Sequence, residues 1–241
     1  MSNPTTASYI GDELSLFEKA VNWKQYWSSF VTPLLGNNVL EVGAGLGGTT
    51  RQLCKPDFKG QWTCLEPDIE LLNQLNRQQA SGTIPAICRT RLGITNDLTE
   101  TDTYSSLLYI DVIEHIEDDG AELKRAAKLL RPGGHLIILV PAHQWLYSPF
   151  DAAIGHYRRY NKARLKQVIP AELDIVRFHY LDSVGLLASS ANKLMLRQSN
   201  PTEGQIRLWD SLMVPASTVV DPIIGRALGK SVLLIARKPT V

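Results

Sequence analysis

Cysteine, long apolar runs and an excess of one charge are all scarce in this sequence. The three cysteines, Cys54, Cys64 and Cys88, are isolated and odd in number, which fits neither a disulfide framework nor a zinc site and favours a reducing compartment. No apolar run approaches the roughly 20 residues that cross a bilayer, and the polar residues 1–11 lack the layout of a secretory signal. With 25 basic and 24 acidic residues the formal net charge is +1, without the basic surface that nucleic acid requires. We therefore expect a soluble, cytoplasmic protein that does not bind nucleic acid.

Apolar bursts that predict strands alternate with stretches of helical periodicity. Apolar and aromatic side chains recur at spacings of three and four over residues 12–35, and helices are also predicted at 69–79 and 121–130. The predicted strands lie at the start of 39–48 and at 62–65, 84–88, 106–110, 135–140, 173–180 and 231–236. This alternation implies βαβ units, hence a parallel sheet with helices on both faces.

Two segments do not follow this alternation of strands and helices. Residues 1–36 are predicted to form an N-terminal helical cap, and residues 37–241 the main domain. Within that domain, residues 181–229 form a long insertion of mixed helical character, broken by Pro201, Pro215 and Pro222. Ordered segments of this length are usually functional. The apolar side chains of the insertion fit a lid packed on the sheet, or a surface for a lipid or a partner.

A glycine turn follows the first predicted strand. Gly43, Gly45 and Gly48 satisfy Gly-x-Gly-x-x-Gly, and glycines let backbone N–H groups approach a ligand closely. In a dinucleotide site the following helix receives a pyrophosphate. In a nucleoside site without phosphates the nearby acid matters more, and Glu41 would repel a pyrophosphate but attract an ammonium or sulfonium. Glu66, at the end of the second strand, can accept the ribose hydroxyls in either case.

Several stretches resemble a known family in the same order. Residues 41–47, EVGAGLG, together with Glu66, look like the first two motifs of class I S-adenosylmethionine (SAM)-dependent methyltransferases. Residues 109–116, YIDVIEHI, resemble the motif after strand four, and 130–138, LRPGGHLII, the turn into strand five. The resemblance implies a Rossmann-like, doubly wound α/β fold with a mostly parallel seven-stranded sheet and an antiparallel last strand. It also implies SAM as cofactor and S-adenosylhomocysteine (SAH) as product.

The resemblance also implies which residues hold the cofactor. The methionyl part would lie at the glycine turn and Glu41, the ribose at Glu66, and the amino-acid end at the backbone near Asp111. Residues 93–98, GITNDL, depart from the family pattern because the usual acid near adenine is replaced by an apolar residue. Adenine recognition is therefore expected from the backbone there. The cofactor-binding residues expected on this basis are Glu41, Gly43, Ala44, Gly45, Glu66, Pro67, Ile94, Thr95, Ile110, Asp111 and His115, the last as support of the cofactor loop.

Methyl transfer from a sulfonium needs positioning and, for a hydroxyl acceptor, a base. Acceptors bind outside the carboxyl ends of the strands, so His143, just past strand five, is the first candidate base, with His156 and Asp151 as further catalytic candidates. No metal site is expected.

The acceptor is expected to contact the segments beside the cleft. Adjacent arginines flanked by tyrosines suit an anion, although a solvated helix face is the alternative for that segment. Trp23 and Tyr26 of the first predicted helix either cover the cofactor cleft or belong to the ordinary hydrophobic core. The expected substrate-binding residues are Trp23, Tyr26, Trp145, Arg158, Arg159 and Tyr160.

These features predict a SAM-dependent methyltransferase that transfers the methyl group to a hydroxyl of a small or medium-sized acceptor. The acceptor can be anionic or lipid-linked. The alternatives are a protein that keeps the cofactor as structure and transfers no methyl group, and an NAD-dependent oxidoreductase. No transmembrane segment is expected, peripheral membrane contact is compatible with the sequence, and the oligomeric state stays open.

Overall fold

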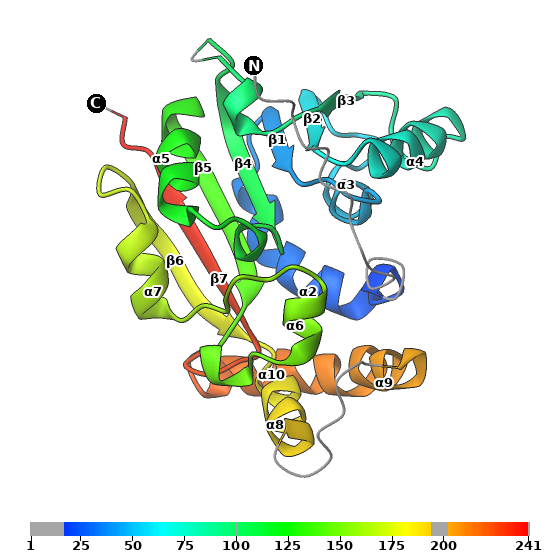
Figure 1. Cartoon of the computed structure of the whole chain (residues 1–241), viewed down its shortest axis with the longest axis vertical. Helices are drawn as coiled ribbons and strands as arrows, with labels where there is room; N and C mark the ends of the chain where they lie inside the picture. Colours follow the sequence, from blue (N-terminus) through cyan, green and yellow to red (C-terminus); the bar gives the residue numbers. More distant parts are fainter. Residues whose placement is uncertain (1–16, 100, 194–201, 241) are drawn as a thin grey trace.

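A seven-stranded sheet forms the centre of the molecule. The computed structural model describes residues 17–99, 101–193 and 202–240. The sheet has the strand order β3-β2-β1-β4-β5-β7-β6, as Figure 1 shows. Its strands are β1 (Asn38–Val42), β2 (Gln61–Glu66), β3 (Cys88–Leu92), β4 (Tyr104–Ile110), β5 (Leu130–Pro141), β6 (Asp174–Leu181) and β7 (Ser231–Arg237).

The direction of the strands confirms the expected Rossmann-like fold. β1 pairs in parallel with β2 and β4, β3 with β2, and β5 with β4, whereas β7 is antiparallel to both β5 and β6. The carboxyl ends of six strands and the start of β7 therefore share one edge of the sheet. Chain order reverses between β1 and β4, and ligands of such sheets bind at this point.

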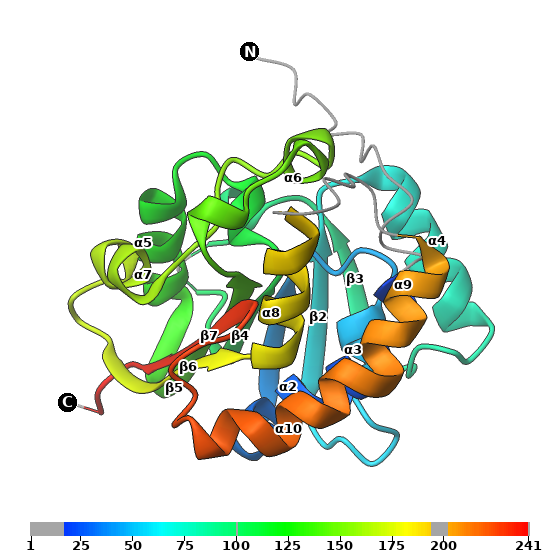
Figure 2. The same ribbon diagram turned by 90° about the horizontal axis from the view of Figure 1, so that it is seen from below.

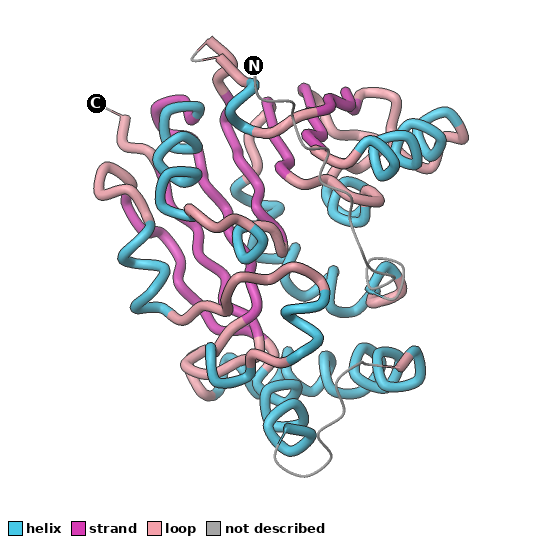
Figure 3. The backbone as a smooth tube through the Cα atoms, in the orientation of Figure 1, coloured by secondary structure: helices cyan, strands magenta, loops and turns pink. Residues whose placement is uncertain are grey.

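Helices cover both faces of the sheet, as expected for βαβ units. Side chains of α5 and α7 pack on one face with Leu40 and Val42 of β1, and side chains of α2, α3 and α4 pack on the other with Val39. Figure 2 shows these two layers, and Figure 3 shows the strands side by side between them. The helices named here are α2 (Val21–Val31), α3 (Gly48–Leu53), α4 (Ile69–Ala80), α5 (Asp119–Leu129) and α7 (Lys162–Val168).

The insertion folds into helices at the carboxyl edge of the sheet. Figure 1 shows α8, α9 and α10 beyond the end of β4, and in Figure 2 α6 and α10 lie on opposite sides of α8. These elements are α6 (Pro149–Ala153), α8 (Ser183–Ala191), α9 (Glu203–Leu208), the π-helical η6 (Trp209–Met213) and α10 (Val214–Ile223). The short helical turns are η1 (Thr32–Leu34), η2 (Thr95–Asp97), η3 (Ile113–His115) and η4 (Gln144–Leu146). No helix within the described ranges is both long and apolar enough to span a bilayer.

Two buried carboxylates join the insertion to the N-terminal helix. Asp210 accepts the backbone N–H groups of Asn22 and Trp23 at 3.1 and 2.8 Å. Asp221, fully buried, accepts the Tyr26 hydroxyl at 2.8 Å. The described part of the predicted cap thus packs on the insertion, while residues 1–16 of that cap lie outside the described residues. The domain boundary at residue 36 and the lid role of the insertion stay predictions.

One strand prediction was wrong. Residues 84–88 were expected to form the third strand, but β3 begins at Cys88 and ends at Leu92. Pro85 lies inside the predicted run, where its carbonyl accepts the Cys88 N–H in a turn, and Ile84 is buried in the core instead. β3 is an edge strand, so it needs fewer apolar side chains than a central strand. Because its residues are largely polar, it lacks the apolar run by which the other strands were predicted.

Candidate active site

The glycine turn after β1 has a backbone conformation that glycine favours. Gly43 and Gly45 adopt positive φ values of 66° and 54°, which non-glycine residues rarely adopt. A Cβ at Gly43 would lie 2.9 Å from a methyl carbon of Val112, so a side chain there would collide with the segment after β4. The turn packs against that segment with backbone alone. Residues 43–47 therefore form a cradle of the kind that receives a nucleoside cofactor between β1 and β4.

Glu66, at the end of β2, forms a hydrogen bond with this turn. It is 4% exposed. Its Oε2 accepts the Gly45 N–H at 2.7 Å, and its Oε1 accepts the Asp68 N–H at 2.9 Å. Burial raises the pKa of Glu66, and these two N–H donors oppose the shift. A carboxylate has about four lone-pair sites, so Glu66 retains acceptor capacity for the two hydroxyls of a ribose. Pro67, which follows it, is half-buried.

Glu41 lies deeper than expected. It is 2% exposed, and its Oε2 accepts the Thr50 hydroxyl at 2.6 Å and the Trp62 indole N–H at 2.8 Å. Burial raises the pKa of Glu41 to about 7, and these two hydrogen bonds oppose the shift. These contacts tie β1 to α3 and β2. Direct contact of Glu41 with a cofactor stays a proposal.

In the turn after β3, polar groups form hydrogen bonds within the protein. The Ile94 N–H is accepted by Asp97 at 2.8 Å, and the Thr95 hydroxyl donates to Glu122 at 2.8 Å. Thr95 is 1% exposed and Ile94 is 48% exposed. The Ile94 N–H is thus already taken by Asp97, and the exposed Ile94 side chain is the part of this turn best placed to pack against an adenine.

The segment after β4 carries two acids and an imidazole. Ile110 is half-buried at the strand end, and Asp111 is exposed with φ 53°. Glu114 is completely buried, and burial raises its pKa well above the usual range. The His115 ring faces the His156 ring, with centroids 4.5 Å apart. Burial lowers the pKa of His115 to about 4. His115 therefore contacts the loop after α6, and its support of the cofactor loop stays a prediction.

His143 follows β5 in a strained conformation. Its φ is 66°, rare for a residue with a side chain and typical of functional sites when it occurs. Its Nε2 lies 3.0 Å from the Gly229 carbonyl oxygen, and its ring stacks on Tyr180 of β6 with centroids 5.1 Å apart. A carbonyl only accepts, so Nε2 carries the proton and Nδ1 of the neutral ring is an acceptor. The neighbouring Trp145 is 52% exposed.

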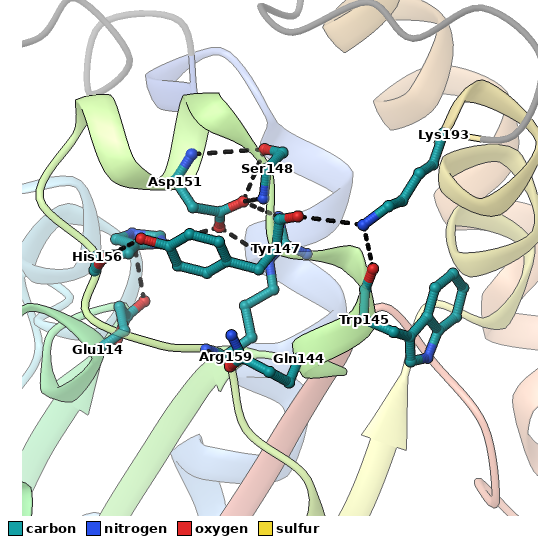
Figure 4. Close-up of polar contacts among 9 residues, drawn as sticks. All are labelled: Glu114, Gln144, Trp145, Tyr147, Ser148, Asp151, His156, Arg159 and Lys193. Atoms are coloured by element: carbon teal, nitrogen blue, oxygen red, sulfur yellow. Dashed lines mark hydrogen bonds and ion pairs between the residues drawn. The ribbon is translucent and has the colours of Figure 1, made fainter.

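Asp151, at the start of α6, is the centre of a charged network (Figure 4). It is 1% exposed and binds the Arg159 guanidinium with two hydrogen bonds of 2.8 and 3.0 Å. His156 Nδ1 lies 3.0 Å from Asp151 Oδ1. Burial acts to raise the pKa of Asp151, but the hydrogen bonds from His156 and Arg159 outweigh it and hold the pKa below its usual range. Asp151 is therefore an ionised orienting group and not a proton acceptor.

Arg158 and Tyr160 do not face a substrate. Arg158 donates to Asp119 at 2.8 Å and to the carbonyls of Ile116 and Glu117. Tyr160 is completely buried, and its hydroxyl donates to the same Asp119 at 2.9 Å. A guanidinium whose donors are satisfied inside the protein gains little from an external anion. The expectation that Arg158 and Tyr160 bind substrate is corrected on this ground, and Arg159 is likewise committed to Asp151.

Trp23 and Tyr26 are core residues. They are 9% and 8% exposed. Trp23 packs against Trp209 of η6 with ring centroids 5.8 Å apart, and burial followed by the Asp221 hydrogen bond raises the pKa of Tyr26. Both side chains thus belong to the hydrophobic core, as the alternative interpretation of the sequence had it, because α2 packs under the insertion.

Sequence reasoning missed Lys230, which precedes β7. Its backbone bonds to Asp182 and Ala142 place it at the carboxyl edge of the sheet. Its Nζ lies 4.8 Å from the centre of the Trp209 ring, and burial lowers its pKa. Its position after the long insertion gave no local signal. Glu114 was also missed, although its adjacency to His115 in the quoted motif was a usable signal.

The chemistry available at this edge follows from the placement. The open glycine turn and Glu66 suit a nucleoside without phosphates, and the segments after β4 and β5 supply imidazoles and carboxylates beside it. This arrangement suits an edge of the sheet at which a cofactor and a second molecule meet.

Comparisons with known proteins agree with this geometry. A family described as "Methyltransferase domain" matches residues 20–184, more than half of the chain. The demethylmenaquinone methyltransferase of Tropheryma whipplei (strain Twist) is 25% identical over 189 residues, which cover 75% of this chain and 72% of the relative. An uncharacterised 37.1 kDa protein from a Streptomyces fradiae transposon is 27% identical over 142 residues, 57% of this chain. This chain spans only 39% of that protein's length.

A solved structure shares the fold at low sequence identity. Coclaurine N-methyltransferase bound to N-methylheliamine and SAH superposes with a TM-score of 0.63 at 12% identity, covering 98% of this chain and 78% of that one. At this identity the likeness concerns the fold.

Proposed function

The chain belongs to the methyltransferase domain family as a class I SAM-dependent methyltransferase, and from this premise we propose that it methylates a hydroxyl-bearing acceptor of small or medium size. The observation that carries the proposal is His143, a strained imidazole at the carboxyl edge of the sheet with Nδ1 left as an acceptor. SAM supplies the methyl group as an electrophilic sulfonium methyl. The residues of this chain then have two tasks, to orient the acceptor and to take its proton.

His143 is suited to the second task. A hydroxyl is a weak nucleophile until it loses its proton, and a positioned base contributes roughly a hundred- to ten-thousandfold. Burial lowers the pKa of His143, so the ring is neutral near pH 7 and available as a base. Its hydrogen bond to Gly229 and its stacking on Tyr180 fix the ring orientation. Exposed Trp145, whose ring centre lies 6.0 Å from that of His143, offers a flat surface for an aromatic acceptor.

The acceptor itself is proposed in broader terms. A relative is named as a demethylmenaquinone methyltransferase, which supports a lipid-linked ring as the acceptor without indicating which of its atoms is methylated. Outward apolar side chains on α9, η6 and α10, among them Leu212 and Ile223 at 63% and 79% exposure, suit such an acceptor. For an anionic acceptor, Lys230 replaces the arginines as the proposed contact, since Arg158 and Arg159 are bound to internal carboxylates.

The test is turnover with SAM carrying an isotopically labelled methyl group and a panel of hydroxylated acceptors that includes a demethylated quinol. His143→Ala should lose about a hundred- to ten-thousandfold in kcat and leave SAH affinity unchanged. His179→Ala is the matched control, because His179 is a half-buried imidazole that packs on Phe30 away from the cleft. Full turnover in His143→Ala would refute its role as the base, and label found on nitrogen or ring carbon and not on oxygen would refute the hydroxyl proposal.

A further inference from the structure

Glu114 is a buried carboxyl group without hydrogen bonds. Its side chain is completely buried, and neither Oε1 nor Oε2 has a hydrogen-bond partner among the described residues. Burying a polar group without a hydrogen-bond partner destabilises the folded chain, and a charged group does so more strongly. Glu114 is thus a buried group whose two oxygens have hydrogen-bonding capacity that the described residues leave unused.

Two imidazoles surround this carboxyl group. His156 Nε2 lies 4.0 Å from Glu114 Oε1, and His115 packs edge to face on His156. One ligand atom from each of the three residues lies within 4.8 Å of the others. The backbone bond from Tyr157 N–H to the Glu114 carbonyl, 2.8 Å long, brings the loop after β5 onto the segment after β4. The cluster is therefore assembled by the fold, although its parts are distant in sequence.

Asp151 orients His156 toward the cluster (Figure 4). Its Oδ1 lies 3.0 Å from His156 Nδ1, and Arg159 and Ser148 hold the carboxylate in place. Because the Asp151 carboxyl already accepts two hydrogen bonds from Arg159, it acts as an acceptor toward Nδ1 as well, which leaves Nε2 on the side of Glu114. Imidazoles that bind metals almost always donate their other N–H to such a carboxylate.

A proton shared between Glu114 and His156 does not account for this geometry. Such a pair would sit within about 3.2 Å, whereas the observed separation is 4.0 Å. Two ligand atoms about 2.1 Å from a tetrahedral ion stand roughly 3.4 Å apart, so the three groups, whose ligand atoms lie within 4.8 Å of one another, are spaced slightly wider than ligands around a bound cation. Small side-chain movements would close the difference.

We propose that Glu114, His115 and His156 bind a divalent first-row transition metal ion. Two imidazole nitrogens and one carboxylate select Zn²⁺, Mn²⁺, Fe²⁺ or Co²⁺ over Mg²⁺ and Ca²⁺, which prefer oxygen ligands. No metal site was expected from the sequence, because His156 lies 42 positions after Glu114 and no ligand motif joins them.

The ion would serve the acceptor side of the cleft. Three protein ligands leave at least one coordination position open, as in catalytic metal sites, and a metal-bound hydroxyl loses its proton more readily. The binding proposal rests on the cluster alone. The further statement that the open position takes the acceptor's oxygen rests on the proposed function.

The experiment is a titration of the full chain, stripped with a chelator and dialysed, with Co²⁺ followed by visible absorption and with Zn²⁺ followed by calorimetry. We expect one ion per chain. His156→Ala and Glu114→Gln should weaken binding at least tenfold, and Asp151→Asn about ten- to hundredfold through the orientation of His156. Glu114→Gln keeps the side-chain shape, and circular dichroism checks the fold of each variant. His179→Ala, an imidazole outside the cluster, should bind as the unmodified chain does.

Two results would overturn the proposal. One is the absence of stoichiometric binding by the unmodified chain, and the other is equal loss of binding in His179→Ala and His156→Ala. SAH affinity measured on the same samples separates this outcome from failure of the proposed function, because SAH binding does not use these ligands.

Discussion

Replacing Glu41 with glutamine should remove a pH-dependent loss of stability. The Glu41 carboxyl is 2% exposed, and burial raises its pKa to about 7. An exposed glutamate in the unfolded chain titrates near 4.3 to 4.5. Between these values the folded chain holds a proton that the unfolded chain has lost, so stability falls as pH rises through this window.

The magnitude follows from the shift. One pKa unit corresponds to about 1.4 kcal/mol, so the penalty reaches about 3 kcal/mol above pH 7. Most of it, about 2 to 3 kcal/mol, appears between pH 5 and pH 8. Glutamine does not ionise, and its Oε1 can still accept from Thr50 and Trp62. Glu41→Gln should therefore gain stability relative to the unmodified chain as pH rises.

The assay is urea unfolding of both proteins at pH 5, 6, 7 and 8. Other titrating groups are common to both chains, so the difference in unfolding free energy isolates Glu41. Glu70→Gln is the matched control, because it makes the same chemical change at an exposed position in the first turn of α4. Parallel stability curves for Glu41→Gln and the unmodified chain would refute the reasoning.

Two further variants test the corrected roles. Arg158→Lys cannot bond Asp119 and two carbonyls together, so the unfolding free energy should fall by about 1 to 2 kcal/mol while the acceptor KM holds; a raised KM at unchanged stability would restore the substrate role. Tyr26→Phe removes a donor to buried Asp221, which keeps two backbone N–H donors. Its unfolding free energy should fall by about 1 kcal/mol with SAH affinity unchanged, and a loss of SAH affinity in calorimetry would contradict its place in the core.

The fold and the shape of the glycine turn could be predicted because their signals are local, while the residues that bind the cofactor stay predictions. The glycine turn, its strand and Glu66 lie within one βαβ unit, where spacing determines geometry. β3 was misplaced because an edge strand lacks the apolar pattern of a buried one.

The acceptor half could not be predicted in the same way, because its partners are distant in sequence. Arg158 reads as an anion-binding residue until Asp119, 39 positions earlier, is seen to bind it. His156 reads as a free base until Asp151 and Glu114 are placed on either side of it. Charge in a sequence does not reveal which charges neutralise one another.

The most direct test of the central claim is calorimetric titration of SAH and of NAD into the unmodified chain and into Glu66→Ala. Glu66 accepts the Gly45 N–H at the glycine turn and is the proposed anchor of the ribose. We predict that SAH binds and NAD does not, and that Glu66→Ala weakens SAH binding by about ten- to hundredfold, the loss of roughly 1.5 to 3 kcal/mol of hydrogen bonding. Unchanged SAH affinity in a folded Glu66→Ala protein, or binding of NAD in place of SAH, would contradict the account.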